Sequence, residues 1–364
     1  MPVEDLILLD QAMEDLDKAI QDQPRSGSTY SLRALAWVEL GDVEKALTDA
    51  KKAIELEPES AGCHCVYALI LAGGIQDHGG AMVEFDQAIK LDPKNPQSYF
   101  GRARCWQNLK ETDKAIADFN ESLRLYPECV ETLVCRGDAW LRKGDLDRAE
   151  ADLSEAIRLA PSVAPAYINR AYVWGKMGKP EKAIQDYDSV VELDGKNVDA
   201  LLGRGIALAK TEQVEKALAD LDQAVELNPK NATIYFNRGM CRAQKEEYGK
   251  ALEDYEMAIR LSPGKAQYLQ LRAWLWATCP DDKYRDADKA LDYAIHACEK
   301  YDWKSSFDLM VLAAVYTDKG LFEKAVEFQE LALTWANDPR AKATGQEMLA
   351  CFKAGKPYRT AFPR

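Results

Sequence analysis

The stretch ATIYFNRGMCRAQKEEYGKALEDYEMAIRLSPGK, residues 232–265, reads as two amphipathic helices joined by a short turn. Asn231 precedes the first helix and is a favourable N-cap, and Pro263 ends the second helix. Within the second helix Ala251 and Ala258 lie on one face, because they are about two helical turns apart. One such pair of helices cannot bury its own apolar faces, so we expect it to stack against similar pairs.

Arg238 in this stretch belongs to a column of arginines that recurs along the chain. From Arg102 onward each step is 34 residues, which is typical of a repeat architecture. The column consists of Arg33, Arg102, Arg136, Arg170, Arg204, Arg238 and Arg272. Residues 27–338 therefore divide into about nine repeats, at 27–60, 61–95, 96–129, 130–163, 164–197, 198–231, 232–265, 266–305 and 306–338. Residues 1–26 carry only an N-terminal half-repeat helix, and residues 339–364 are expected to form a C-terminal capping helix and tail.

This pattern resembles the tetratricopeptide repeat (TPR) family across nearly the whole chain. The resemblance implies an all-α fold, an α-solenoid in which antiparallel helix pairs form a right-handed superhelix. It also implies that the first helices of the repeats line a concave groove that binds a peptide or a partner protein. The stretch 271–303 and the closing KAGKPYR, residues 353–359, resemble the end of bacterial TPR arrays that follow signalling or enzymatic domains. The resemblance implies a bacterial source.

An aspartate follows most of the column arginines after sixteen residues, on the second helix of the same repeat. The predicted pairs are Arg33/Asp49, Arg102/Asp118, Arg136/Asp152, Arg170/Asp186, Arg204/Asp220 and Arg238/Asp254. Where the arginine or the aspartate is replaced, we match Tyr67 with Glu84 and, in the last repeat, Leu312 with Phe328. In the long repeat Arg272 meets Tyr293, with Asp292 beside it. A charge buried between helices requires a partner, so we interpret these arginines as structural, with ligand contact as the alternative.

Neighbouring columns of the first helices face the groove, as the family resemblance implies. The predicted partner-binding residues in these columns are Phe100, Arg104, Asn169, Tyr172, Phe236, Asn237, Met240 and Trp274. The lysines that a carboxylate clamp of this family uses are absent, so we expect an extended or helical segment with large hydrophobic anchors. The alternative is that most of these side chains only pack inside the solenoid.

The composition disfavours several classes of function. The net charge is −13, and neither nucleic acid nor an anionic membrane attracts such a chain. No histidine lies in a metalloprotease motif, and no glycine-rich phosphate loop precedes a helix. Cys63, His64 and Cys65 do not supply a metal site, because residues two apart on a helix diverge. We therefore predict no enzyme activity, no cofactor and no metal, and expect a protein or peptide partner.

The chain context leaves several alternatives open. MPVEDLILLD does not read as a signal peptide, which predicts a cytoplasmic protein unless an upstream segment is removed. The missing first half-repeat suggests as an alternative an interaction or regulatory region of a larger multidomain enzyme, such as a bacterial protein kinase or transferase. Residues 1–22 are acidic and residues 353–364 basic, so homo-oligomers through the N-terminal helix are a further expectation. The pairing of Cys279 with Cys298 is left open.

Overall fold

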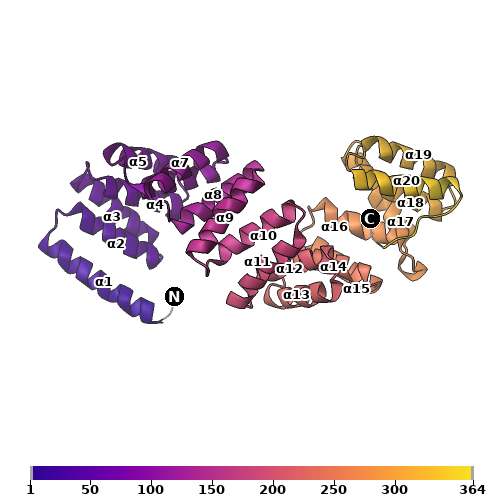
Figure 1. Ribbon diagram of the computed structural model, residues 1–364, viewed down its shortest axis with the longest axis horizontal. Helices are drawn as coiled ribbons and strands as arrows, with labels where there is room; N and C mark the ends of the chain where they lie inside the picture. The colour runs from indigo at the N-terminus through magenta and orange to yellow at the C-terminus, as the bar shows by residue number, and fades with distance from the viewer. Residues whose placement is uncertain (1–2, 362–364) are drawn as a thin grey trace. The chain divides into compact units, whose positions relative to one another are not determined.

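The structure is a computed structural model that describes residues 3–361 (Figure 1). Within this range every long element is an α-helix, and the described residues contain no strand. The chain divides into two compact units, Met1–Met177 and Gly178–Arg364, called unit 1 and unit 2 below. The prediction of an all-α chain of stacked helix pairs is confirmed.

Unit 1 holds ten helices among its described residues, coloured from indigo to magenta in Figure 1. Consecutive helices pack as antiparallel pairs, α2 with α3, α4 with α5, α6 with α7, and α8 with α9. The helices are α1 (Val3–Asp22), α2 (Gly27–Glu39), α3 (Val43–Leu56), α4 (Ala61–Gly74), α5 (His78–Leu91), α6 (Pro96–Asn108), α7 (Thr112–Leu125), α8 (Val130–Lys143), α9 (Leu146–Leu159) and α10 (Ala164–Lys176).

Unit 2 continues the same pattern to the C-terminal helix. Its pairs are α12 with α13, α14 with α15, α16 with α17, and α18 with α19, while α20 covers α19. The elements are α11 (Pro180–Leu193), α12 (Val198–Lys210), α13 (Val214–Leu227), α14 (Ala232–Gln244), α15 (Tyr248–Leu261), α16 (Ala266–Thr278), the 3-10 helix η1 (Asp282–Tyr284), α17 (Ala287–Lys300), α18 (Ser306–Asp318), α19 (Phe322–Trp335) and α20 (Pro339–Lys353).

Small residues let neighbouring helices approach closely, both between successive pairs and within one pair. A Cβ atom built on Gly101 of α6 would lie 2.2 Å from Cζ of Phe85, and one on Gly205 of α12 would lie 2.9 Å from Cγ of Leu221. Caps fix the helix starts: the Asn95 side chain accepts from the Gln97 amide, and Pro96 takes the first helical position. The spacing of the repeat is therefore fixed by packing and by capping together.

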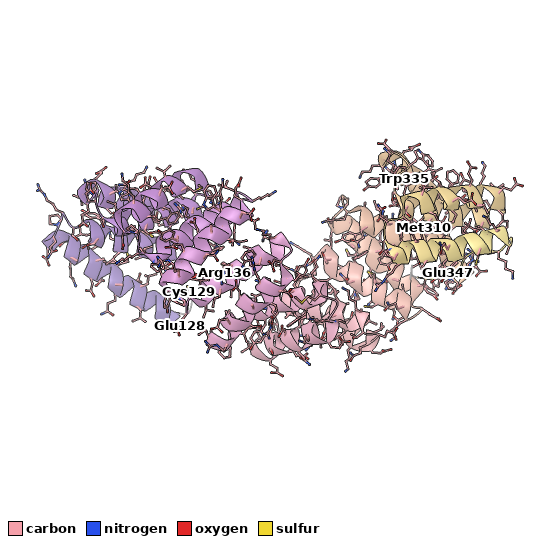
Figure 2. The ribbon with its side chains drawn as sticks, turned by 45° about the horizontal axis from the view of Figure 1, so that its top comes forward. Glu128, Cys129, Arg136, Met310, Trp335 and Glu347 are labelled. Atoms are coloured by element: carbon pink, nitrogen blue, oxygen red, sulfur yellow. The ribbon has the colours of Figure 1, made fainter. Side chains whose placement is uncertain are left out.

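The packed faces form separate apolar clusters along each unit. In unit 2 the cluster around α16–α20 includes Trp274, Met310 and Phe352, each less than a tenth exposed, and Met310 is labelled in Figure 2. Trp335 at the end of α19 is 42% exposed and lies outside this core. Among the described helices, none combines the length and the apolar character that crossing a membrane requires.

Asp308 of α18 is a buried carboxyl group whose hydrogen-bond partners are neutral. Gln270 Nε2 donates to it at 3.2 Å and the Tyr293 hydroxyl at 3.4 Å. Burial raises the pKa of Asp308, because neither partner supplies a positive charge to offset the lost hydration.

We expect Asp308→Asn to remove one component of the pH dependence of stability. An acid whose pKa is raised in the folded state stabilises that state most below its unfolded pKa, and the contribution is lost as pH rises through the folded pKa. The free energy of unfolding of the wild type minus that of the variant should therefore fall as the pH rises over the range above about pH 4, by about 1.4 kcal/mol for each unit by which the pKa is raised. Urea unfolding of both proteins across this range measures the difference, and parallel curves would contradict the assignment.

Candidate functional site

The arginine column joins three helices at a time. Arg102 of α6 donates from Nε and Nη2 to the two carboxylate oxygens of Asp118 in α7, at 2.8 and 2.7 Å. Its Nη1 donates to Asp86 in α5, at 2.6 Å. The hydrogen bond with Asp118 raises the pKa of Arg102, so the guanidinium remains charged throughout the ordinary pH range.

The same arrangement recurs along both units. Each arginine contacts the aspartate sixteen residues ahead and a polar residue sixteen residues behind: Arg33 with Asp49 and Asp17, Arg136 with Asp152 and Asn120, Arg204 with Asp220 and Asp188, and Arg238 with Asp254 and Asp222. Arg136 is labelled in Figure 2. Arg170 and Asp186 belong to different units, so their pairing stays a prediction, and within unit 1 Arg170 donates to Ser154 at 2.9 Å.

Sequence reasoning missed the partner behind each arginine. In the sequence, these partners form a second column of polar residues, two positions after the aspartate column. Examples are Asn120 after Asp118 and Asp222 after Asp220. The contact links each repeat to the one before it. These side chains are therefore engaged in helix packing and offer a ligand little free hydrogen-bonding capacity.

In two irregular repeats, the structure shows side-chain partners other than those predicted from the sequence. Glu84 lies 2.6 Å from His64 Nδ1, and His64 Nε2 lies 2.9 Å from the Pro58 carbonyl oxygen, so His64 instead of Tyr67 is its partner. Both ring nitrogens of His64 are thereby occupied by protein atoms. No cluster of three metal-ligating side chains occurs in the described part of the chain.

Arg272 is the second irregular case. It pairs with Glu256 behind it, and its guanidinium lies 4.5 Å from the centre of the Trp276 ring. Tyr293, its predicted match, donates instead to Asp308. The additional residues of this repeat, around η1, have displaced the second helix relative to the sixteen-residue spacing.

The predicted partner-binding residues separate into buried and accessible ones. Phe100, Phe236 and Trp274 are 9%, 5% and 0% exposed and pack in three different apolar clusters. Met240 packs against the same cluster as Phe236, and Asn237 Nδ2 donates to the Thr233 carbonyl oxygen of its own helix at 2.8 Å. For Phe100, Phe236 and Trp274, this burial favours the alternative that they pack inside the solenoid.

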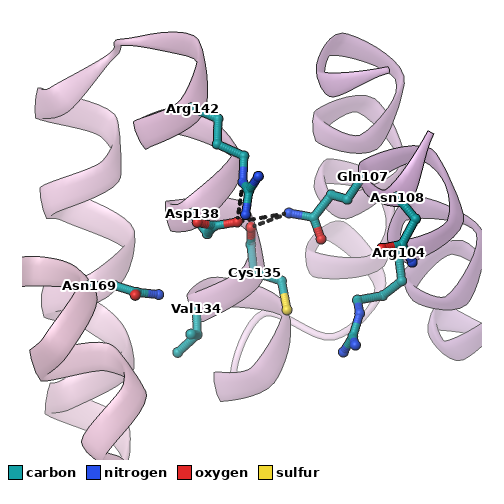
Figure 3. Close-up of a pocket in the computed structure, with 8 residues that line it drawn as sticks. All are labelled: Arg104, Gln107, Asn108, Val134, Cys135, Asp138, Arg142 and Asn169. Atoms are coloured by element: carbon teal, nitrogen blue, oxygen red, sulfur yellow. Dashed lines mark hydrogen bonds and ion pairs between the residues drawn. The ribbon is translucent and has the colours of Figure 1, made fainter. Parts of the chain in front are cut away.

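Arg104, Asn169 and Tyr172 all belong to unit 1, and two of them line one pocket. Tyr172 on α10 is 52% exposed, and it lies one helical turn after Asn169. Asn169 and Arg104 line a pocket of about 360 Å³ between α6, α8 and α10 (Figure 3). The remaining lining residues are Gln107, Asn108, Val134, Cys135, Asp138 and Arg142.

The pocket is polar, in contrast to the apolar surface expected from the sequence. Asp138 accepts from Arg142 Nε at 2.8 Å and lies 3.4 Å from Gln107 Nε2, as Figure 3 shows. Arg104 is about half exposed, and its Nη1 is 3.6 Å from Glu131. A guanidinium at that distance from an exposed carboxylate remains available to an incoming acceptor.

Cys135 is the one thiol that lines this pocket. Burial raises its pKa to about 11, so the reactive thiolate is scarce at neutral pH. The pocket therefore offers hydrogen-bond donors and acceptors instead of a nucleophile. Its chemistry suits the recognition of peptide amides and carboxylates.

Models of the tetratricopeptide repeat match residues 28–60, 84–117, 108–164, 168–221, 204–275 and 309–339, which together make up more than half of the chain. The chain belongs to the tetratricopeptide repeat family. Within this TPR protein, 108 residues are 29% identical to Hsp70-Hsp90 organizing protein 3 of Arabidopsis thaliana, a match that covers 29% of the chain and 18% of that relative. The chain thus aligns with less than a fifth of that protein.

Solved TPR structures share the fold. A tetratricopeptide repeat protein from Parabacteroides merdae is 21% identical, with a TM-score of 0.52 over 71% of this chain and 96% of its own. The Cut9-Hcn1 hetero-tetramer structure of the APC/C is 13% identical, with a TM-score of 0.57 over 93% of this chain and 81% of its own. At these identities the likeness concerns the fold.

Proposed function

We propose that this TPR protein is a non-catalytic scaffold that binds an extended, acidic peptide segment of a partner protein at the pocket of unit 1. One observation carries the proposal. Arg104, Asn108 and Asn169 line a single pocket with side-chain donors, on the face formed by the first helices of consecutive repeats. An extended peptide has backbone carbonyl groups that match such donors.

Charge and shape favour an acidic segment. Arg104 is held only loosely by Glu131, so an acidic side chain or a terminal carboxylate on the ligand replaces a weak contact with a closer one. Tyr172 adds an exposed aromatic face on α10, with the Lys176 ammonium 5.4 Å from its ring centre. An aromatic side chain of this kind anchors a peptide at low cost in conformational entropy.

The likeness to the Hsp70-Hsp90 organizing protein supports the same general role. The name of that relative describes a protein that organises two others. A repeat array with a polar pocket on its first helices suits such a role without any chemical step. The identity of the partner does not follow from a match that covers 18% of the relative.

Peptide binding by an Arg104→Glu variant tests the proposal. A displayed library of extended peptides is selected on the wild type, and the affinities of the selected peptides are measured for wild type and variant by fluorescence anisotropy. We expect acidic peptides, and at least a tenfold loss of affinity in the variant, because the new carboxylate repels them and the bond to Arg104 is gone.

Arg158→Glu on α9 is the matched control. Arg158 is similarly exposed and pairs with Glu155 one turn away, but it lies on a second helix, away from the residues that line the pocket. This control should bind like the wild type. Equal losses of affinity in the two variants would show that the change in net charge causes the effect. Unchanged affinity of Arg104→Glu would refute the proposed site.

A further inference from the structure

The C-terminal tail of unit 2 lies against the first helices of its own last repeats. After α20 the chain turns at Gly355, which has a positive φ of 67°. The Thr360 amide then donates to the carbonyl oxygen of Thr278 at 2.9 Å, and the Thr278 hydroxyl shares its one hydrogen between the carbonyl oxygens of Thr360 and Trp274, each at 2.7 Å. One full and one shared hydrogen bond therefore hold the tail's backbone at the C-terminal end of α16.

The side chains of the tail add contacts of two other kinds. Arg359 pairs with Asp318 of α18 and donates to the Ala277 carbonyl oxygen at 3.2 Å. The Tyr358 ring meets the Trp274 ring edge-on, with centroids 6.5 Å apart. The Tyr358 hydroxyl also donates to Glu347 of α20, which is labelled in Figure 2. The tail thus combines backbone, ionic and aromatic recognition, as a bound extended peptide does.

Within unit 2, the tail contacts the positions of the repeat that correspond to pocket-lining positions of unit 1. In α6 these are the residues two, five and six places after Arg102, namely Arg104, Gln107 and Asn108. In α16 the residues two, five and six places after Arg272 are Trp274, Ala277 and Thr278, and all three contact the tail. We call these three columns the inner columns. Asp318 occupies the last of them on α18, six places after Leu312, which takes the place of the column arginine in that repeat.

We propose that the inner columns of α16 and α18 form a second peptide-binding site, which the chain's own residues 356–361 occupy and which an external segment of the same chemistry takes over when they leave. The preferred external segment is extended and basic. It has an aromatic residue, then an arginine, and then a residue whose backbone N–H can donate a hydrogen bond. This inference goes beyond the proposed function, since it concerns another unit and a ligand of opposite charge.

The half-buried state of the tail agrees with a reversible contact. Tyr358, Arg359 and Thr360 are each only partly buried, so part of each tail residue already meets solvent in the bound state. A tethered segment acts at an effective concentration on the order of 1 mM. An external peptide therefore competes poorly with the tail of the same chain and binds well once the tail is absent.

A chain ending at Gly355 tests the site with a labelled peptide, GKPYRTA, of residues 355–361. We expect the shortened protein to bind this peptide at least tenfold more tightly than the full chain does, in fluorescence anisotropy. The peptide with Arg359→Glu should lose at least tenfold in affinity, and so should the shortened protein with Asp318→Ala. Asp288→Ala is the matched control, because Asp288 is an exposed aspartate on α17, and it should not change binding. A shortened protein that keeps its helical circular dichroism and does not bind the peptide overturns the proposal.

Amide hydrogen exchange on the full chain decides the question if the shortened protein does not fold. We expect the Thr360 amide to be protected in the wild type and to exchange at least tenfold faster in Asp318→Ala, while the amide of Leu275, inside α16, keeps its rate. Millimolar GKPYRTA should have the same selective effect in the wild type. If Thr360 is unprotected, or if Leu275 always accelerates together with it, the tail is no exchangeable ligand and the proposal fails.

Discussion

Replacing Phe236 by alanine lowers the free energy of unfolding by about 3–5 kcal/mol. The ring is 5% exposed and lies between two other rings, with its centroid 4.7 Å from that of Tyr268 and 6.1 Å from that of Tyr255. Truncation removes this apolar area from the core and leaves a cavity that a packed helix pair cannot close. Urea unfolding followed by circular dichroism measures the loss.

Tyr172→Ala is the control for Phe236→Ala, because it removes an exposed aromatic side chain instead of a buried one. Tyr172 belongs to the same predicted partner-binding set, but it is 52% exposed, so its removal should change the free energy of unfolding by no more than about 0.5 kcal/mol. If Phe236→Ala unfolds at the same urea concentration as the wild type, Phe236 does not act through packing, and its assignment to the binding surface regains support.

Replacing Arg204 by alanine costs about 3 kcal/mol, near the lower end of the range for breaking a buried ion pair. Asp220 then keeps a buried carboxylate that has lost two hydrogen bonds, from Nε at 2.8 Å and Nη2 at 2.7 Å. About a fifth of the arginine side chain is exposed, which moderates the effect. Chemical unfolding of the single variants and of the double variant measures it.

The double variant Arg204→Ala/Asp220→Ala should cost less than the sum of the two single variants, because removing both charges leaves neither one unpaired. Asp188→Ala is the milder control: Asp188 is about half exposed, and water solvates the vacated guanidinium group. Strict additivity of Arg204→Ala and Asp220→Ala would contradict the assignment of the arginine column to helix packing.

The repeat was predictable from the sequence because it appears many times in one chain. Arg102, Arg136 and Arg204 are each followed by an aspartate sixteen residues later, and this repetition within one chain stands in for an alignment. Helix pairs, caps and the sixteen-residue contacts follow from that period. Asp86 and Asp188, the partners behind the arginines, belong to the preceding repeat, so a search within single repeats passes over them.

The binding surface was harder to predict because a first helix has neighbours on several sides. A column that faces the inner side at Arg104 is covered by another segment at Trp274, and both positions read as equivalent in the sequence. Phe100 and Phe236 are large enough to reach back into the space between helices, where burial is more favourable than exposure. The contact of the tail with Thr278 spans 82 residues, and no local pattern signals it.

The contacts sixteen residues ahead and sixteen residues behind each arginine also restrict how such a chain can change length. Duplicating or deleting a whole repeat of 34 residues restores every contact. Inserting or deleting a few residues inside a repeat instead moves the forward or the backward partner of one arginine out of hydrogen-bonding distance. The repeat at 266–305 carries such a change, and there Arg272 keeps only its backward partner, Glu256. Genes for arrays of this kind should therefore grow and shrink in whole modules, with irregular insertions confined to the places where a bridge has already been given up.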